Sequence, residues 1–174
     1  MKKLRIFNLL LANVLAFIVV GCSGPLAPHI GEWADPNPSP ESYNSLVLNR
    51  DNSAIFSVDD MIMGGNNFFL VEDGIEIRMK VTYEIDYEKD PAWIDFELYP
   101  EEIKFSEGSE KYSTEHKLMI EEMFHADKKQ QTSYLKGIIR FVSDNQMELQ
   151  TSEISRPTVF DPENEDYLLL KRIK

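Results

Sequence analysis

The sequence predicts an all-β protein built as an antiparallel barrel of about eight strands, with one short helical insertion. The strongest signal is the regular alternation of apolar and polar residues over residues 75–86, which indicates a strand with one buried and one solvated face. The alternation returns over residues 93–99, which Pro91 and Pro100 bracket. A strand with one solvated face is typical of an antiparallel sheet, and closing such a sheet into a barrel removes its exposed edges.

Six further segments complete the expected strands, and turn residues separate them. These segments are residues 46–48, 54–58, 66–71, 135–142, 146–151 and 167–173. Asp51-Asn52, Asp73-Gly74 and Ser143-Asp144-Asn145 supply turns between neighbouring strands. Gly64-Gly65, within "MIMGGNN", indicates a loop, because the lysine of a phosphate-binding loop is missing after it. Short strands at close intervals favour a barrel or a sandwich.

The charge-rich residues 101–132 interrupt the strand pattern and are expected to form an insertion. Within it, residues 114–128 have apolar side chains near one helical face, and Ser113 or Thr114 is a suitable N-cap. We expect a helix that packs over one end of the barrel. A strand over residues 117–124 is the competing interpretation.

The N-terminal residues have the pattern of a secretory signal. The basic "MKKLR" precedes a nearly continuous apolar stretch over residues 6–20, which is short for a membrane-spanning helix. The segment ends in Val19-Val20-Gly21-Cys22, and Cys22 is the only cysteine of the chain. This ending resembles the bacterial lipobox, which implies a signal peptide over residues 1–21 and acyl chains on Cys22. An ordinary cleaved signal and an uncleaved anchor helix are the alternatives.

The residues after Cys22 and the overall charge fit an anchored, exported domain. Residues 22–43 are rich in proline and predict an extended tether, which includes a possible first strand at residues 30–33. The domain is then expected over residues 44–174, in the cell envelope, at the outer membrane facing the periplasm if the cell has two membranes. The formal net charge of −12 becomes about −15 without residues 1–21, which disfavours nucleic acid as a partner.

Several motifs along residues 30–174 occur in the same order as the motifs of a known group of barrels. They are Gly31-Glu32-Trp33, the segment "VTYEIDYEKDPAWIDFEL" at 81–98, Gly137-Ile138-Ile139, Asp144-Asn145, Arg156-Pro157-Thr158-Val159-Phe160 and Leu168-Leu169-Leu170-Lys171-Arg172. Together they resemble a family of uncharacterised bacterial lipocalin-like domains. The resemblance implies a lipocalin-like barrel in which Arg172, from the last strand, lies over Trp33 at the closed end, as a structural contact.

Candidate metal and catalytic residues are few. Glu121, Glu122 and His125, with His116 nearby, have helical ligand spacing, but one element supplies too few ligands, and a solvated helix face is the simpler interpretation. The acidic run "FDPENEDY" at 160–167 lacks the glycine and final glutamate of an EF-hand loop. No Gly-x-Ser-x-Gly motif occurs in the chain. The sequence therefore predicts no metal, no cofactor and no enzymatic activity.

The expected function is the binding of a small apolar ligand inside the barrel. The residues expected to line the ligand cavity face inward on the two longest strands. They are Ile77, Met79, Val81, Tyr83, Ile94, Phe96 and Leu98. The alternative is a solid barrel that serves as an envelope scaffold or a protein-interaction module, with no small-molecule ligand. The presence or absence of a cavity separates the two hypotheses.

Overall fold

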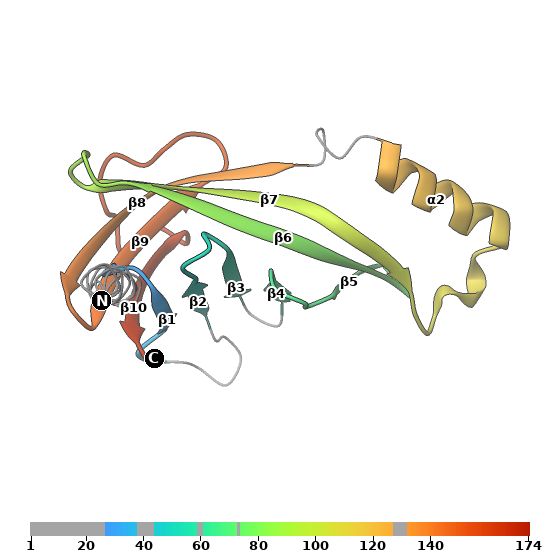
Figure 1. Cartoon of the computed structure of the whole chain (residues 1–174), viewed down its shortest axis with the longest axis horizontal. Coiled ribbons are helices and arrows are strands. Elements are labelled where there is room, and N and C mark those ends of the chain that lie inside the picture. Colours follow the sequence, from blue (N-terminus) through green and yellow to red (C-terminus); the bar gives the residue numbers. More distant parts are fainter. Residues whose placement is uncertain (1–26, 38–43, 59–60, 73, 127–131) are drawn as a thin grey trace, which may run out of the picture.

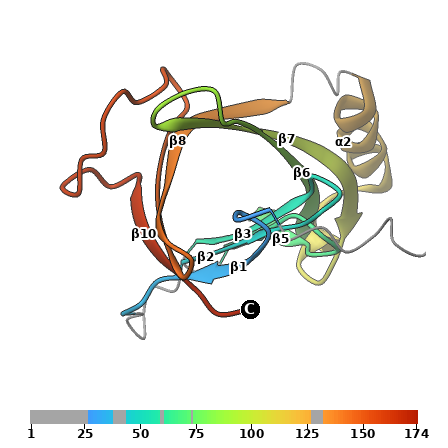
Figure 2. The ribbon, with the colours of Figure 1, turned by 60° about the vertical axis from the view of Figure 1, so that its left-hand side comes forward.

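The computed structural model describes residues 27–37, 44–58, 61–72, 74–126 and 132–174. Within them, ten antiparallel strands form one sheet that curls into a nearly closed barrel, joined by one α-helix, α2, and one 3-10 turn, η1 (Figures 1 and 2). The all-β antiparallel barrel with one helix is confirmed, whereas the expected number of about eight strands is wrong.

The elements follow one another along the chain with short connections. They are β1 (Gly31–Ala34), β2 (Ser45–Leu48), β3 (Ala54–Val58), β4 (Met61–Met63), β5 (Phe69–Glu72), β6 (Ile75–Asp86), β7 (Ala92–Phe105), η1 (Ser109–Lys111), α2 (Thr114–Ala126), β8 (Ser133–Ser143), β9 (Gln146–Ser152) and β10 (Tyr167–Arg172). The two strands beyond the expected eight are β1, at the possible first strand, and β4, in the segment expected to be a loop. The signal segment, the lipobox and Cys22 lie outside the described residues.

The sheet has the strand order β4-β3-β2-β1-β10-β9-β8-β7-β6-β5, so β4 and β5 are its two edges. The barrel is brought toward closure by contacts between the β2–β3 turn and β6. Ser53 forms an isolated bridge with Thr82, and the amide of Tyr83 donates a hydrogen bond of 2.9 Å to the carbonyl of Asn52. These bonds join the β2–β3 turn to β6, although β2 and β3 are far from β6 in the strand order.

The longest hairpin is formed by β6 and β7, as the alternating pattern predicts. Register pairs run from Ile75–Phe105 to Asp86–Trp93, but the register shifts between Arg78, which faces Glu102, and Met79, which faces Pro100. Glu101 is therefore the extra residue of a β-bulge. The expectation that Pro100 ends the strand is wrong, because a bulge accommodates a residue without an amide hydrogen.

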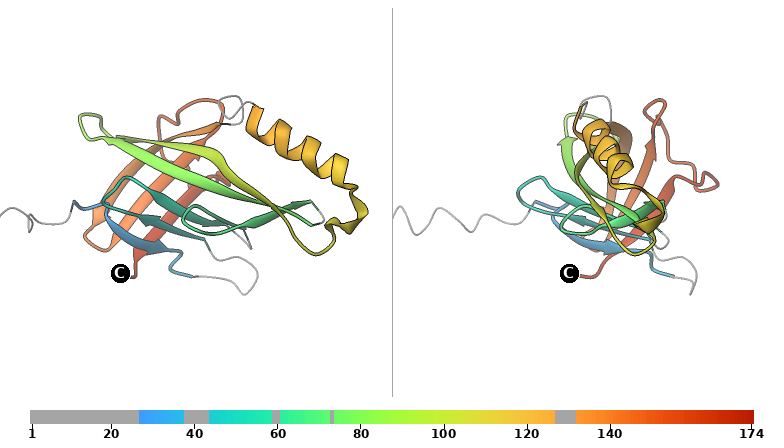
Figure 3. Two further views of the ribbon diagram at one scale, coloured as in Figure 1. Left: turned by 45° about the vertical axis from the view of Figure 1, so that its right-hand side comes forward. Right: turned by 90° about the vertical axis from the view of Figure 1, so that its right-hand side faces the viewer.

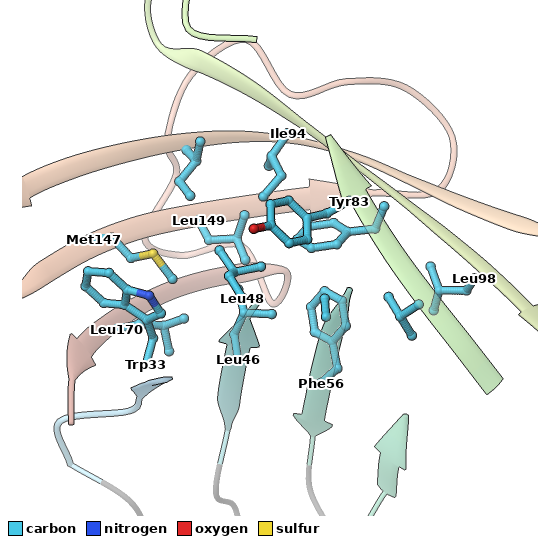
Figure 4. Close-up of a cluster of buried hydrophobic side chains, with 14 residues drawn as sticks. Trp33, Leu46, Leu48, Phe56, Tyr83, Ile94, Leu98, Met147, Leu149 and Leu170 are labelled. Carbon is cyan, nitrogen blue, oxygen red and sulfur yellow. The ribbon is translucent and has the colours of Figure 1, made fainter. Parts of the chain in front are cut away.

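The packed core fills the part of the barrel next to β1 and the β6–β7 turn. Its side chains come from both walls and point toward one another in the interior (Figure 4). The buried cluster consists of Trp33, Leu46, Leu48, Ala54, Phe56, Val81, Tyr83, Ile94, Phe96, Leu98, Ile139, Met147, Leu149 and Leu170. Alternation along each strand supplies this cluster, since every second side chain faces inward.

Helix α2 confirms the helical interpretation of the insertion, and its start is set by a cap. The hydroxyl of Ser113 accepts a hydrogen bond of 3.2 Å from the amide of His116. Figures 1 and 3 show α2 beside the far ends of β6 and β7, which extend beyond β8, β9 and β10. Phe124 is its buried residue, whereas Leu118 and Met119 are about half exposed, at 54% and 49%.

Candidate ligand-binding cavity

An open cavity of about 1070 Å³ occupies the end of the barrel opposite Trp33. We call this the open end, and the end that contains Trp33, His29 and Arg172 the closed end. The wall contains twelve apolar side chains, four neutral polar ones and three carboxylates. The lining residues are Asn44, Phe56, Val58, Met61, Ile62, Met63, Asn67, Phe68, Phe69, Leu70, Leu135, Leu149, Thr151, Ser152, Glu153, Ile154, Glu165, Asp166 and Leu168.

Short strands and strand ends build this wall. The ends of β3 and β9 and the starts of β8 and β10 meet here, and β4 and β5, with three and four residues, complete the circle. These two strands are the edges of the sheet, and they do not pair with each other. The sheet therefore remains unpaired between β4 and β5, beside the cavity.

The cavity ends at the packed core, whose side chains form its inner boundary. Phe56 and Leu149 belong to both, since each lines the cavity and lies in the buried cluster. Phe56 is held against Phe96 in an edge contact, with ring centroids 4.6 Å apart. The interior is thus solid in one half and hollow in the other.

Apolar side chains remain exposed around the mouth of the cavity. Met61 and Ile62 are 42% and 41% exposed, Leu70 is 61% exposed, and Ile154 is 94% exposed. All four line the cavity. A contiguous set of exposed apolar side chains at the rim of a hollow is typical of a surface that binds an apolar molecule.

The residues predicted to line a ligand cavity lie deeper in the barrel. Five of them are buried in the core cluster, and Met79 packs against that cluster. The five are Val81, Tyr83, Ile94, Phe96 and Leu98. Ile77, on the outer part of β6, is half buried and faces Phe69 and Ile103 on its neighbours. The cavity wall comes from other strands.

The charges around the cavity are unevenly distributed. Glu153, Glu165 and Asp166 line it, and no basic residue does. Two cations lie over the ring of the lining residue Phe68, where Lys104 is 4.1 Å and Arg78 is 5.6 Å from the centroid.

Both of these cations are neutralised by carboxylates. Arg78 forms an ion pair of 2.7 Å with Glu102, and Lys104 forms one of 2.8 Å with Glu76. The hydrogen bond from Lys104 is the largest cause that holds the pKa of Glu76 below its usual value. The three carboxylates of the wall therefore dominate the local potential.

The closed end is built around Trp33, which is fully buried. The guanidinium of Arg172 lies 4.4 Å from the centre of its ring, and the two residues face each other across β1 and β10. The indole Nε1 donates a hydrogen bond of 2.9 Å to the carbonyl of His29, and Arg172 also donates to the carbonyl of Pro28. This is the barrel-end arrangement that the resemblance to lipocalin-like domains implies.

Burial at the closed end shifts the pKa of two ring side chains. It raises the pKa of Tyr83 to about 12, and the Tyr83 hydroxyl donates a hydrogen bond of 2.8 Å to the carbonyl of Asn49. Burial lowers the pKa of His29, whose Nδ1 is hydrogen-bonded to the hydroxyl of Tyr87. Both shifts favour the uncharged form, so burial at this end excludes charge from these two rings.

Arg156 fixes the loop that forms one side of the open end. Its guanidinium donates to both carboxylate oxygens of Asp95, at 2.6 and 2.8 Å, and to the carbonyl of Gly137 at 2.7 Å. It also lies 4.4 Å from the centre of the Trp93 ring. The motif Arg156-Pro157-Thr158 was visible in the sequence, but its partners were not, because they lie about 20 and 60 positions away.

Glu121, Glu122 and His125 lie on α2 as predicted, and the described residues contain no group of three or more His, Cys, Asp or Glu side chains placed to hold a metal ion. Nor does any helix in these ranges have the length and apolar character needed to cross a membrane.

Comparisons with protein-family models, with curated proteins and with solved structures found no match to the chain. The open cavity, with its apolar wall and exposed apolar mouth, is the candidate functional site.

Proposed function

We propose that the protein is a lipid-anchored, exported carrier, without enzymatic activity, that binds one small apolar ligand in the open cavity. Acyl chains on Cys22 would hold it at the membrane, and the proline-rich tether would separate the barrel from the lipid surface. The observation that carries the proposal is the cavity itself, which combines twelve apolar wall residues with an exposed apolar mouth.

The size and chemistry of the cavity support a small molecule rather than water as its occupant. Its volume of about 1070 Å³ lies at the upper end of ordinary ligand sites. Water in such a space gains few hydrogen bonds from Val58, Met63 and Leu135, so its replacement by an apolar ligand is favourable. The packed core below keeps the wall rigid, which lowers the entropic cost of binding.

Native mass spectrometry of protein purified from its own membrane tests the anchor and the ligand together. We expect the mass of a chain that begins at Cys22 and carries acyl chains, and we expect gentle ionisation to retain a bound apolar molecule. Cys22→Ala removes the acyl chains but leaves the barrel able to bind. A mature chain without acylation contradicts the anchor, and membrane retention of Cys22→Ala with an uncleaved N-terminus supports an anchor helix instead.

Met61→Lys, compared with Val159→Lys, tests whether the ligand occupies the cavity. Met61 lines the mouth and is 42% exposed, so the barrel tolerates a lysine there, while Val159 is 68% exposed and lies outside the wall. We expect Met61→Lys to weaken binding of the neutral fluorescent probe Nile red about tenfold or more, because the cation must be desolvated. Absence of saturable binding to the wild type, or equal loss in both variants, contradicts the proposal.

A second candidate function, protein interaction, is favoured by the surface of α2. Leu118, Met119 and Met123 are 54%, 49% and 64% exposed, which is unusual for three apolar residues within two turns of a helix. In this alternative the barrel is a scaffold that presents α2. Retention of the same partner protein in native mass spectra, lost in Leu118→Gln but not in Met61→Lys, would favour this function over ligand binding.

A further inference from the structure

The charge distribution of the cavity points to the class of its ligand. We propose that the cavity binds a cationic amphiphile, a molecule with an apolar chain and a protonated amine head, and discriminates against anionic amphiphiles such as fatty acids. The inference rests on the proposed function, because it assigns the chemistry of the ligand at that same site. The apolar wall would hold the chain, and the carboxylates would face the head.

Antiparallel pairing of β9 and β10 brings the three carboxylates to one part of the wall. Tyr167 faces Gln150, and beyond this pair the amide of Thr151 donates to the carbonyl of Asp166 at 3.4 Å. Glu165 and Glu153 then follow on the two chains as they leave the sheet. Residues distant in sequence thus form one acidic rim, defined as Glu153, Glu165 and Asp166, beside the apolar Ile154 and Leu168.

The acidic rim has no cationic partner among the described residues, where every ion pair is made by other carboxylates. On the neighbouring strand β8, Lys136 faces Ser152 in the register. Lys136 lies outside the cavity wall, because its neighbour Leu135 faces inward and strand side chains alternate. The charge of the rim is therefore free to act on a ligand.

A second observation on the cavity wall, independent of its charges, favours a ligand that donates hydrogen bonds. The Oδ1 atom of Asn44 is buried and accepts no hydrogen bond from any described residue. Asn44 lines the cavity, before the start of β2. A buried acceptor without a donor is costly, and a protonated amine is a donor only. The acceptors of the wall and its negative potential therefore fit the same kind of head group.

An anionic head meets the opposite conditions. It would enter a wall with three carboxylates and no basic residue, in a chain whose formal net charge is −12. Arg78 and Lys104, the two cations over the ring of Phe68, already pair with carboxylates. Because a partly enclosed apolar site screens charge less than water does, this repulsion reduces affinity even for a ligand whose chain fits well.

Three ligands with the same chain and different heads test the inference on the full-length protein. Dodecylamine, dodecanol and dodecanoate are cationic, neutral and anionic near neutral pH, and each competes with Nile red at concentrations where it remains monomeric. We expect dodecylamine to bind about tenfold or more tightly than dodecanoate, with dodecanol between them. Added salt is expected to narrow this range, because it screens the rim.

Removal of the rim charges provides the matched variant. The triple variant Glu153→Gln, Glu165→Gln, Asp166→Asn is expected to lower dodecylamine affinity to that of dodecanol, and to leave dodecanol affinity unchanged. The control variant, Glu84→Gln, Glu88→Gln, Asp144→Asn, removes three exposed charges near the closed end. We expect it to keep the order of affinities, with dodecylamine highest and dodecanoate lowest. Equal losses in both variants mean that net charge alone acts, and they overturn the inference.

The outcomes also separate this inference from the function on which it rests. If dodecanol binds and dodecylamine has no advantage over dodecanoate, the preference for cations is wrong and the carrier function stands. If none of the three ligands binds and Nile red binding does not saturate, the preference for cations and the carrier function are both wrong. If the rim variant loses dodecanol as well, the carboxylates support the wall and do not select the ligand.

Discussion

The two ends of the barrel use the same alternating strands with opposite results. At the closed end, Trp33 is fully buried beneath Arg172, and its indole nitrogen is hydrogen-bonded. At the open end, Met61 and Leu70 line a cavity and remain 42% and 61% exposed. The difference follows from strand pairing, since β1 is paired on both sides, with β2 and β10, whereas the edge strands β4 and β5 are each paired on one side only. We therefore expect stability to be concentrated at the closed end, while the cavity lies at the other.

Truncation of Trp33 is the most severe test of this contrast. Trp33→Ala removes the largest fully buried side chain, and we expect it to lower the free energy of unfolding by about 3–5 kcal/mol. Met61→Ala, at the open end, is expected to change it by about 0.5 kcal/mol or less. Urea denaturation followed by circular dichroism measures both values.

Trp93 is the matched control for the loss of a tryptophan. It is 40% exposed on the outside of β7, where it contacts Arg156, and we expect Trp93→Ala to cost about 1 kcal/mol. Equal costs for Trp33→Ala and Met61→Ala would mean that the two ends do not differ in stability, and the contrast would be wrong.

Arg156→Leu sharpens the contrast, because Arg156 holds the loop that carries the acidic rim of the open end against β7 and β8. The substitution removes the paired bonds to Asp95 and the bond to Gly137, from a side chain that is 16% exposed. We expect a loss of about 1–3 kcal/mol, with faster hydrogen exchange in residues 153–166 and unchanged exchange near Trp33.

Arg140→Leu is the control, since Arg140 also pairs with a carboxylate but is 56% exposed. An exposed pair contributes about 1 kcal/mol or less, and hydrogen exchange in residues 153–166 should change less than in Arg156→Leu. Faster exchange at both ends in Arg156→Leu would show that the loop supports the whole barrel and not the open end in particular.

The sequence alone was sufficient for features that depend on local pattern. The alternation over residues 75–86 gave the bounds of β6, and Ser113 marked the start of α2. It was insufficient at Pro100, because the bulge that accommodates a proline depends on the register with β6. It also missed β4, since three residues around Ile62 carry too short a pattern.

The candidate site depended on contacts that pattern cannot supply. Alternation correctly placed Val81 and Phe96 inside the barrel, but whether an inward side chain meets another side chain or a void depends on how far the opposite strands extend. Met61 and Leu70 come from segments that looked like a loop and a partner strand. The acidic rim depends on the pairing of β9 with β10, between residues about 15 positions apart in sequence.

The smallest expected effect concerns protonation at the closed end. Burial lowers the pKa of His29 below its ordinary value of 6.5, so the unfolded chain binds the proton more readily than the folded one. The stabilisation is complete above about pH 6.5 and decreases as the pH falls through the lowered pKa. We expect wild type to lose more stability than His29→Phe between about pH 7.5 and about pH 5.5, as measured by urea denaturation.

His116→Phe is the control for this prediction, because His116 is exposed on α2 and far from Trp33. His29→Phe keeps a ring beside Tyr83, whose centroid lies 5.6 Å from that of His29, and removes the titrating nitrogen that contacts Tyr87. We expect His116→Phe to retain the wild-type dependence on pH and His29→Phe to reduce it. If all three proteins lose the same stability on acidification, the closed end tolerates the imidazolium, and exclusion of charge is not part of what makes the two ends differ.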